Sequence, residues 1–307
     1  MSTRARASRD DLGFRVATGG FGVLLVGIVM AIGVALTQQS WLAIHKFGLS
    51  FWRTSTWDPV AGEFGALPFI WGTLYSSVLA LLVATPVSIG IAVFIVELAP
   101  SWMRQPLVFL TELLAAIPSI VYGLWGIFVL VPAVRAFQVW LPDGLRHLPI
   151  FAGPPLGVGM LSATLILAVM VVPFTSSVAR EVLKAVPRAQ REGAYALGAT
   201  RLEAIRVALY SARTGIVGAI MLGFGRALGE TMAVTMVIGN NPQISASLFA
   251  PQYTMAAVIA NEFTEAVDAL YLNALVEIGL VLFIITLIVN ALSRVLIWRM
   301  SSPRARG

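Results

Sequence analysis

EVLKAVPRAQREGAYALGATRLEAIRVALYSAR, residues 181–213, runs directly into TGIVGAIMLGFGRALGETMAVTMVIGN, residues 214–240. The first part is basic and helix-forming, and the second is an apolar run with Arg226 near its centre and Glu230 four residues later. A charge at the middle of a membrane-spanning helix costs at least ~2.5–3.5 kcal/mol on insertion scales, so it usually marks a function. We therefore interpret the first part as a contact for another protein and the second as part of a path for a polar solute.

The composition is that of a chain whose solvent is lipid. Hydrophobic residues make up 58% of its 307 residues and charged residues 12%, and the mean hydropathy is +0.86. The absence of cysteine excludes disulfides, thiol chemistry and cysteine metal sites. The two histidines, His45 and His147, are far apart in sequence. The sequence therefore predicts no catalytic residue and no metal site.

Apolar stretches long enough to cross a membrane divide the chain. The first, residues 16–36, follows a basic segment, residues 1–15, that a signal peptide would share. Its length of about 21 residues exceeds the hydrophobic region of a signal peptide and favours an uncleaved spanning helix. The other five cover approximately residues 64–96, 107–131, 157–179, 214–240 and 271–298. The sequence thus predicts an all-α integral membrane protein with six transmembrane helices, five of them in a core over residues 69–298.

The distribution of basic residues predicts the orientation. Sixteen Lys and Arg lie in the segments on the side of the two termini, against four in the intervening segments. Cytoplasmic loops carry the excess of Lys and Arg, so both termini, the loop at residues 180–212 and the tail at residues 299–307 are expected in the cytoplasm. A nucleic-acid-binding protein would not need its basic residues to alternate between rich and poor segments, so that function is set aside.

Three segments are expected on the outer side, residues 37–68, 132–155 and 240–270. Residues 37–68 are rich in aromatic side chains, including Trp41, Trp52 and Trp57. Such residues are enriched where lipid meets water, although packing against short helices of the same segment explains them equally well. Residues 132–155 are expected to form a polar outer loop.

Arg226 is about 20 Å from either end of its apolar run at the helical rise of 1.5 Å per residue, too far to reach water. Glu230 is its natural partner on the same helix face. Gly225 and Gly229 bracket the arginine at a spacing that lets helices approach closely. Because paired guanidinium donors match oxyanions, the sequence predicts a pathway for phosphate or a carboxylate. The alternative is a buried ion pair that fixes helix packing.

Other residues within the spans are assigned structural roles. Glu112 and Glu277 each lie near a helix end and are expected to reach interfacial water. Pro118 breaks the hydrogen-bond ladder of its helix and frees the Leu114 carbonyl, which a neighbouring group must then satisfy. Tyr122 is a polar neighbour for which ordinary helix packing is favoured.

The loop at residues 180–212 reads as amphipathic. Leu197, Ile205 and Leu209 can share an apolar stripe, and Pro187 can open a helix. Such a segment could lie on an anionic lipid surface or insert a short helix into a groove on a soluble partner, and the physical chemistry leaves both readings open.

EGAYALG, residues 192–198, followed by ATRLEAIRV, resembles the EAA loop of ABC importer permeases. Glu192, Ala194 and Gly198 match that pattern, while Gly193 replaces an alanine. Residues 208–211 depart from the Ile-x-Leu-Pro that ends the family pattern. The resemblance implies an ATPase-coupling loop formed by Glu192, Gly193, Ala194, Tyr195, Ala196, Leu197, Gly198, Ala199 and Thr200.

Three further stretches narrow the resemblance. STWDPVAGEFGALPFIWGTL at residues 55–74, LAAIPSIVYGLWG at 114–126 and GRALGETMAVTMVIGN at 225–240 resemble the PstC-type permeases of bacterial phosphate importers. That resemblance implies a type I ABC importer (MetI-like) permease fold in the bacterial inner (plasma) membrane. It also implies that phosphate passes Arg226 and Glu230.

The same family implies partners: a sister permease of the PstA type, an ATPase dimer of the PstB type and an external phosphate-binding protein of the PstS type. Neither lysine of this chain follows a glycine, so the core of a P-loop is absent from its sequence. ATP and Mg would therefore be bound by the partner ATPase, and no cofactor is expected in this chain. The alternative function is an ion-coupled secondary anion transporter that uses the Arg226 and Glu230 pair, with Glu230 and Glu277 as relay groups. A membrane enzyme or redox anchor is disfavoured.

Overall fold

The computed structural model describes residues 9–301, almost entirely as helices. In chain order the main elements are α1 (Arg9–Gln39), α2 (Trp41–Phe47), α3 (Leu67–Val93), α4 (Ser101–Ala116), α5 (Ser119–Trp125), α6 (Val131–Trp140), α7 (Asp143–Arg146), α8 (Met160–Lys184), α9 (Arg188–Ala196), α10 (Arg201–Leu228), α11 (Met232–Thr235), α12 (Met255–Glu262) and α13 (Ala269–Ser301). Short 3₁₀ and π turns and a two-residue β-hairpin complete them: η1 (Gly48–Trp52), β1 (Trp57–Asp58), β2 (Glu63–Phe64), η2 (Phe94–Leu98) and η3 (Gly126–Leu130). The basic segment predicted at 1–15 and the tail predicted at 299–307 lie outside the described residues over 1–8 and 302–307.

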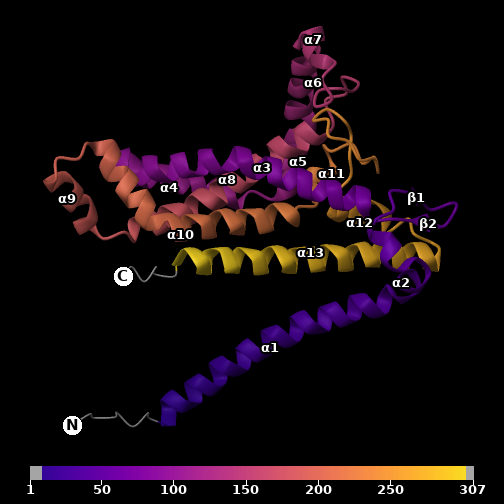
Figure 1. Cartoon of the computed structure of the whole chain (residues 1–307), viewed down its shortest axis with the longest axis horizontal. Coiled ribbons are helices and arrows are strands. Elements are labelled where there is room, and N and C mark those ends of the chain that lie inside the picture. The colour runs from indigo at the N-terminus through magenta and orange to yellow at the C-terminus, as the bar shows by residue number, and fades with distance from the viewer. Residues whose placement is uncertain (1–8, 302–307) are drawn as a thin grey trace.

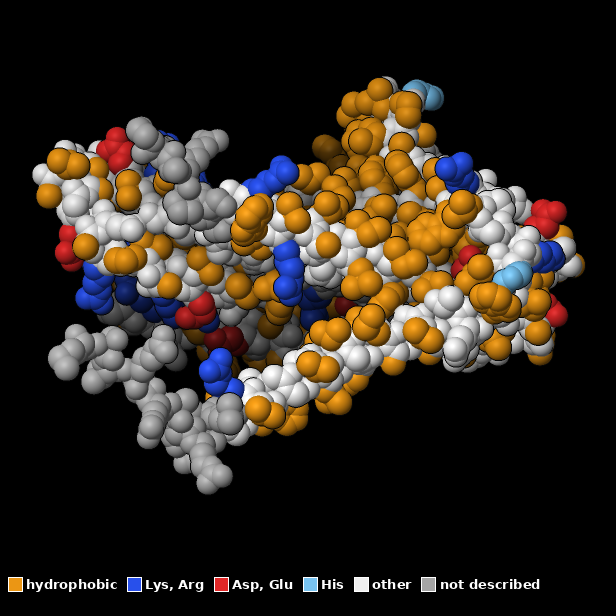
Figure 2. All heavy atoms as spheres, turned by 60° about the horizontal axis from the view of Figure 1, so that its bottom comes forward, with side chains coloured by type: hydrophobic (Ala, Val, Ile, Leu, Met, Phe, Trp, Pro, Cys, Tyr) orange, Lys and Arg blue, Asp and Glu red, His pale blue; other side chains and the backbone are white. Residues whose placement is uncertain are grey.

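Helix α8 forms the centre of the bundle. Helices α3, α4 and α10 pack along it (Figure 1), and its buried residues join those of neighbouring helices in one apolar cluster. Small residues permit this packing. A Cβ on Gly223 of α10 would lie 2.4 Å from the Thr175 hydroxyl oxygen of α8, so only glycine allows the two helices to approach this closely. Figure 2 shows apolar side chains along much of the visible face, as expected for a surface that meets lipid.

Among the described residues, six helical segments are long and apolar enough to cross a membrane, which confirms the predicted number. They cover Gly13–Gln39, Leu67–Leu98, Ser119–Trp140, Met160–Lys184, Arg201–Leu228 and Ala269–Met300. The beginning of α1, helix α9 and the end of α13 lie at the same end of the molecule (Figure 1). That arrangement agrees with a shared side for the two terminal helices and the central loop.

The third predicted span, residues 107–131, is divided in the structure. Helix α4 ends at Ala116, Ile117 and Pro118 are extended, and α5 and η3 follow. Helix α6 then turns away from the bundle and projects from it (Figure 1). The polar loop predicted at 132–155 is therefore wrong in its first part. The break has a plain cause, because proline cannot donate the backbone hydrogen bond that a continuous helix needs.

The outer segment forms a small aromatic cluster. The β1–β2 hairpin pairs Trp57 with Phe64, and the Trp57 ring meets those of Phe64 and Phe69 edge-on at centroid distances of 4.8 and 4.9 Å. The Trp57 indole N–H donates to Glu262 Oε2 at 2.8 Å. The sequence left open whether these aromatic residues lie at the lipid–water interface or pack within their own segment. Trp57 packs, whereas Trp41 is exposed.

Helix α1 stands partly apart from the bundle. It contacts α13 near its outer end, where Gly33 faces the Phe283 ring, and diverges from the other helices towards its beginning (Figure 1). The apolar side chains along its first half are exposed in the single chain.

Candidate functional site

Arg226 lies in the last turn of α10, which ends at Leu228. The sequence suggested a single helix through residues 214–240 with Arg226 at its centre, and the structure corrects this. Helix α10 begins at Arg201, stops two residues after the arginine, and is followed by the short helix α11. The carbonyl end of a helix favours a cation through its partial negative charge, which suits a guanidinium at this position.

Glu230 does not pair with Arg226. It lies beyond the end of α10, so the predicted i, i+4 relation on one helix face is wrong. Its Oε1 atom accepts a hydrogen bond from the Ala233 backbone N–H at 3.4 Å, at the beginning of α11. Among the described side chains, no salt bridge joins the two residues. Arg226 and Glu230 are thus close in sequence but do not form an ion pair.

The Arg226 side chain is exposed in the single chain. Its Cζ atom lies 5.9 Å from the centre of the Phe174 ring of α8, at the outer limit of a cation–π contact. Among the described residues it makes no salt bridge or hydrogen bond. A Cβ added at Gly225 would meet nothing within 4 Å. Gly225 and Gly229 therefore do not bring two helices of this chain together. They leave open the surface on which the guanidinium lies.

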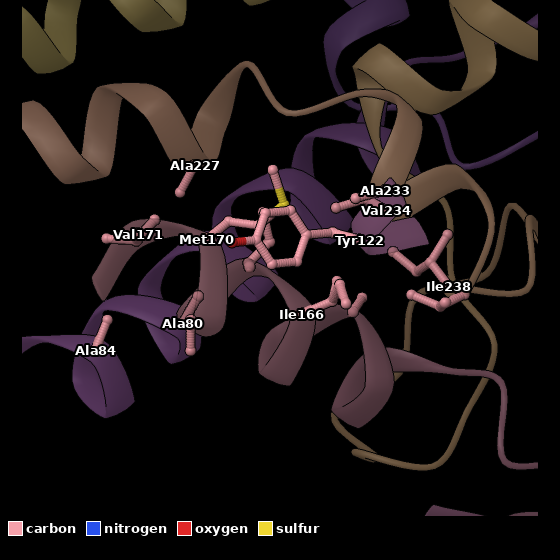
Figure 3. Close-up of a cluster of buried hydrophobic side chains, with 14 of the residues drawn as sticks. Ala80, Ala84, Tyr122, Ile166, Met170, Val171, Ala227, Ala233, Val234 and Ile238 are labelled. Carbon is pink, nitrogen blue, oxygen red and sulfur yellow. The ribbon is translucent and has the colours of Figure 1, made fainter. Parts of the chain in front are cut away.

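Tyr122 of α5 belongs to the buried apolar cluster of the bundle. Its ring lies among side chains of α8, α10 and α11 (Figure 3). Its hydroxyl donates a hydrogen bond of 2.8 Å to the Leu114 carbonyl, the group that Pro118 frees. The prediction that a neighbour satisfies this carbonyl is confirmed. The Tyr122 hydroxyl therefore has a structural role at the break between α4 and α5.

The predicted coupling segment, Glu192–Thr200, lies at the opposite end of α10. Its first part belongs to α9, which begins at Arg188 directly after Pro187 and ends at Ala196. Gly193 lies within α9 and does not interrupt it. Gly198 follows with φ +84°, a conformation that a side chain strains, and so turns the chain. Thr200 then caps α10 in a reciprocal capping box with Glu203.

The tip of this segment exposes apolar side chains. Leu197 is 91% exposed, and Tyr195 and Leu202 are also exposed. The predicted stripe of Leu197, Ile205 and Leu209 is wrong, because Leu197 lies in the turn after α9 whereas Ile205 and Leu209 pack towards the bundle. The exposed apolar residues are instead Tyr195, Leu197 and Leu202, which are available to contact a partner.

One helix connects the two candidate regions. Helix α10 has 28 residues, about 42 Å at 1.5 Å per residue. It begins immediately after the coupling segment and carries Arg226 in its last turn. The sequence separated a loop at 180–212 from the span that follows, and the structure places residues 201–212 of that loop in the same helix as the span.

Two ion pairs that the sequence did not reveal hold together the end of the bundle near α9. Arg191 pairs with Glu97 at 2.7 Å, and Arg180 pairs with Glu112 at 3.1 Å. The pairs join residues 94 and 68 positions apart in the chain, so no local sequence pattern reveals them. The Glu112 side chain is partly exposed, as expected. Glu277 is only 3% exposed and its Oε2 has no hydrogen-bond partner among the described residues, so the expectation that it reaches interfacial water is wrong.

Known proteins resemble this chain over nearly its full length. "Phosphate transport system permease protein PstC" of Haemophilus influenzae is 47% identical, with 95% of each chain covered. The protein of the same name from Mesorhizobium japonicum is 44% identical, with 98% of this chain and 94% of the relative covered. In structure, the chain resembles a chain of the MetNI methionine ABC transporter in an inward-facing conformation, with a TM-score of 0.58 and 15% identity over 76% of this chain and 95% of that one. The latter similarity shows a shared permease fold.

The family model described as "Binding-protein-dependent transport system inner membrane component" matches residues 84–302. The match includes the coupling segment, all of α10 and the open surface around Arg226. The chain belongs to this family of binding-protein-dependent inner-membrane transport components.

Proposed function

We propose that this chain is a membrane-spanning permease subunit of an ATP-driven importer of inorganic phosphate and forms half of the translocation path. The observation that carries the proposal is Arg226, whose guanidinium has no salt bridge or hydrogen bond to any described residue at the end of a helix that starts at the coupling segment. The relatives named as phosphate transport permeases support phosphate as the anion.

Each part of the site has a task in this proposal. The Arg226 donors hold phosphate transiently through charge-assisted hydrogen bonds. Glu230, four residues further along the chain and beyond the end of α10, repels the anion and limits how tightly it binds, which favours release. No side chain of this subunit breaks a covalent bond. ATP and Mg are bound by a partner ATPase of the PstB type.

The coupling segment contacts that ATPase. Its exposed tip, with Leu197 and Tyr195, inserts into a groove on the ATPase dimer, and α10 carries the displacement to Arg226. A sister permease of the PstA type supplies the other half of the path, and a PstS-type protein delivers phosphate from outside. Both termini are placed in the cytoplasm, since the basic residues follow the positive-inside rule.

The test uses the complete complex in proteoliposomes, with radiolabelled phosphate uptake and ATP hydrolysis measured together. Arg226→Gln removes a charge-assisted contact worth about 1.5–3 kcal/mol, so uptake should fall about tenfold or more while the complex still assembles. Arg213→Gln is the matched control, because Arg213 lies on the same helix and stacks on Tyr210 at 4.1 Å. Near-normal uptake by Arg226→Gln would contradict the proposal. Uptake driven by an ion gradient without ATP would favour the secondary transporter instead.

A further inference from the structure

Glu97 receives hydrogen bonds from two arginines that bracket the coupling segment. It lies in the π-helical turn η2 that ends α3. Its Oε1 atom accepts hydrogen bonds from Arg191 Nε at 2.9 Å and Nη2 at 2.7 Å. Its backbone carbonyl accepts a third, of 2.7 Å, from Nη2 of Arg201, the first residue of α10. The residues just before and just after Glu192–Thr200 are thus both attached to the end of α3.

Arg191 also closes the end of α8. Its Nη1 donates to the Val186 carbonyl at 2.8 Å, and its Nη2 donates to the Leu183 carbonyl at 3.0 Å. These carbonyls lie at or just beyond the end of α8, where backbone acceptors lack partners within the helix. One guanidinium therefore joins α3, α8 and α9, a task for which the planar fork of arginine is suited and the single ammonium of lysine is not.

Burial distinguishes this pair from the other charges nearby. The Arg191 and Glu97 side chains are 17% and 14% exposed, whereas those of Lys184 and Glu181 in a neighbouring ion pair are 50% and 59% exposed. Ion pairs exposed to solvent contribute little, and breaking a buried pair leaves an uncompensated charge. The tip at Leu197 meanwhile remains free to contact a partner.

We propose that Glu97, Arg191 and Arg201 are positioning residues that transmit displacement of the coupling segment to α3. The inference rests on the proposed function, since it assigns a second route from the ATPase contact into the bundle. Helix α10 carries the displacement to Arg226, and the Glu97 attachment carries it to α3, which packs on both α8 and α10. Without the attachment, the coupling segment moves while α3 does not follow.

The experiment measures phosphate taken up per ATP hydrolysed by the complete complex in proteoliposomes, for Glu97→Gln, Arg191→Gln and the double variant. We expect complexes that assemble and hydrolyse ATP but show a ratio at least about fivefold lower, the lower end of typical coupling between sites. The double variant should be no worse than Arg191→Gln, because Arg191→Gln already removes the contact with the Glu97 carboxylate together with the bonds to the end of α8. Arg191→Lys should remain impaired, and Lys184→Gln, which breaks the exposed pair, should behave as wild type.

Two results would overturn the inference. In one, the ratio is unchanged in assembled complexes. In the other, uptake and hydrolysis fall in parallel with the yield of co-purified complex, as expected of residues that only stabilise the fold. Failure of the proposed function is distinguishable, because the wild-type complex itself would then lack ATP-dependent phosphate uptake.

Discussion

Gly198 shows how a single residue shapes the coupling segment. Its φ of +84° is a left-handed conformation, although a Cβ there would meet no atom within 4 Å. The demand for glycine is therefore conformational rather than steric. Gly193, five residues earlier, is equally open but lies within helix α9. The two glycines are a matched pair for substitution.

Gly198→Ala should disturb the turn between α9 and α10 at a cost of about 1–2 kcal/mol and weaken docking of the ATPase. Gly193→Ala should be neutral or slightly stabilising, because alanine is the better helix former by about 0.5–1 kcal/mol. Co-purification of the ATPase with each variant measures the difference. Equal retention of the ATPase by both variants would show that the turn does not matter for docking.

Glu277 is a buried carboxyl without a hydrogen-bond partner among the described residues. An ionised carboxylate in such surroundings is costly. Glu277→Gln, which keeps the shape and removes the possibility of ionisation, should therefore retain assembly and near-wild-type uptake. Glu277→Lys should reduce the yield of complex. If Glu277→Gln assembles normally but loses transport, the carboxyl has a direct part in translocation and the structural assignment fails.

The break between α4 and α5 is stabilised by one hydrogen bond from Tyr122. The Leu114 carbonyl also accepts the Ile117 backbone N–H at 3.4 Å, so Tyr122→Phe removes one of two hydrogen bonds and should cost about 0.5–1.5 kcal/mol, with a lower Tm in detergent. Tyr75→Phe is the control, because the Tyr75 hydroxyl makes a bond of the same length, 2.8 Å, to the Ala246 carbonyl at an exposed position. A Tm for Tyr122→Phe no lower than that of the control would show that the break is stabilised by other contacts.

The long apolar helices could be predicted from the sequence. The places where one helix ends and a short helix follows directly were harder to predict. Pro118 signalled the break after α4 correctly because proline lacks a backbone donor. Gly229, the C-cap of α10, is a weaker marker because glycine is also common within membrane helices, so the apolar run at residues 214–240 concealed the end of α10. The direction of α6 depends on tertiary contacts that follow no period in the sequence.

The same division applies to the site. A guanidinium within an apolar run is visible from the sequence because burying an unpaired charge is so unfavourable. The absence of an ion pair between Arg226 and Glu230 could not be predicted, because an i, i+4 spacing implies a pair only where the helix is continuous. The Arg191 attachment to Glu97 was also hidden, since its partners are 94 residues apart.

At the scale of the whole molecule, one helix and one attachment connect the coupling segment to the bundle. Helix α10 leads to Arg226, and Glu97 leads to α3. Much of α1 and the surface around Arg226 are left uncovered by this chain. An open guanidinium on an uncovered surface fits the proposal that this subunit pairs with a second permease.

The central claim is that the Arg226 position faces an aqueous anion path and not lipid. Because this chain has no native cysteine, Arg226→Cys introduces a thiol that can be modified selectively when the partner chains also lack cysteine. The thiol should react with a water-soluble cationic thiosulfonate added from the aqueous phase, and the restored charge should recover part of the lost uptake. Reaction with lipid-soluble reagents alone would contradict the account.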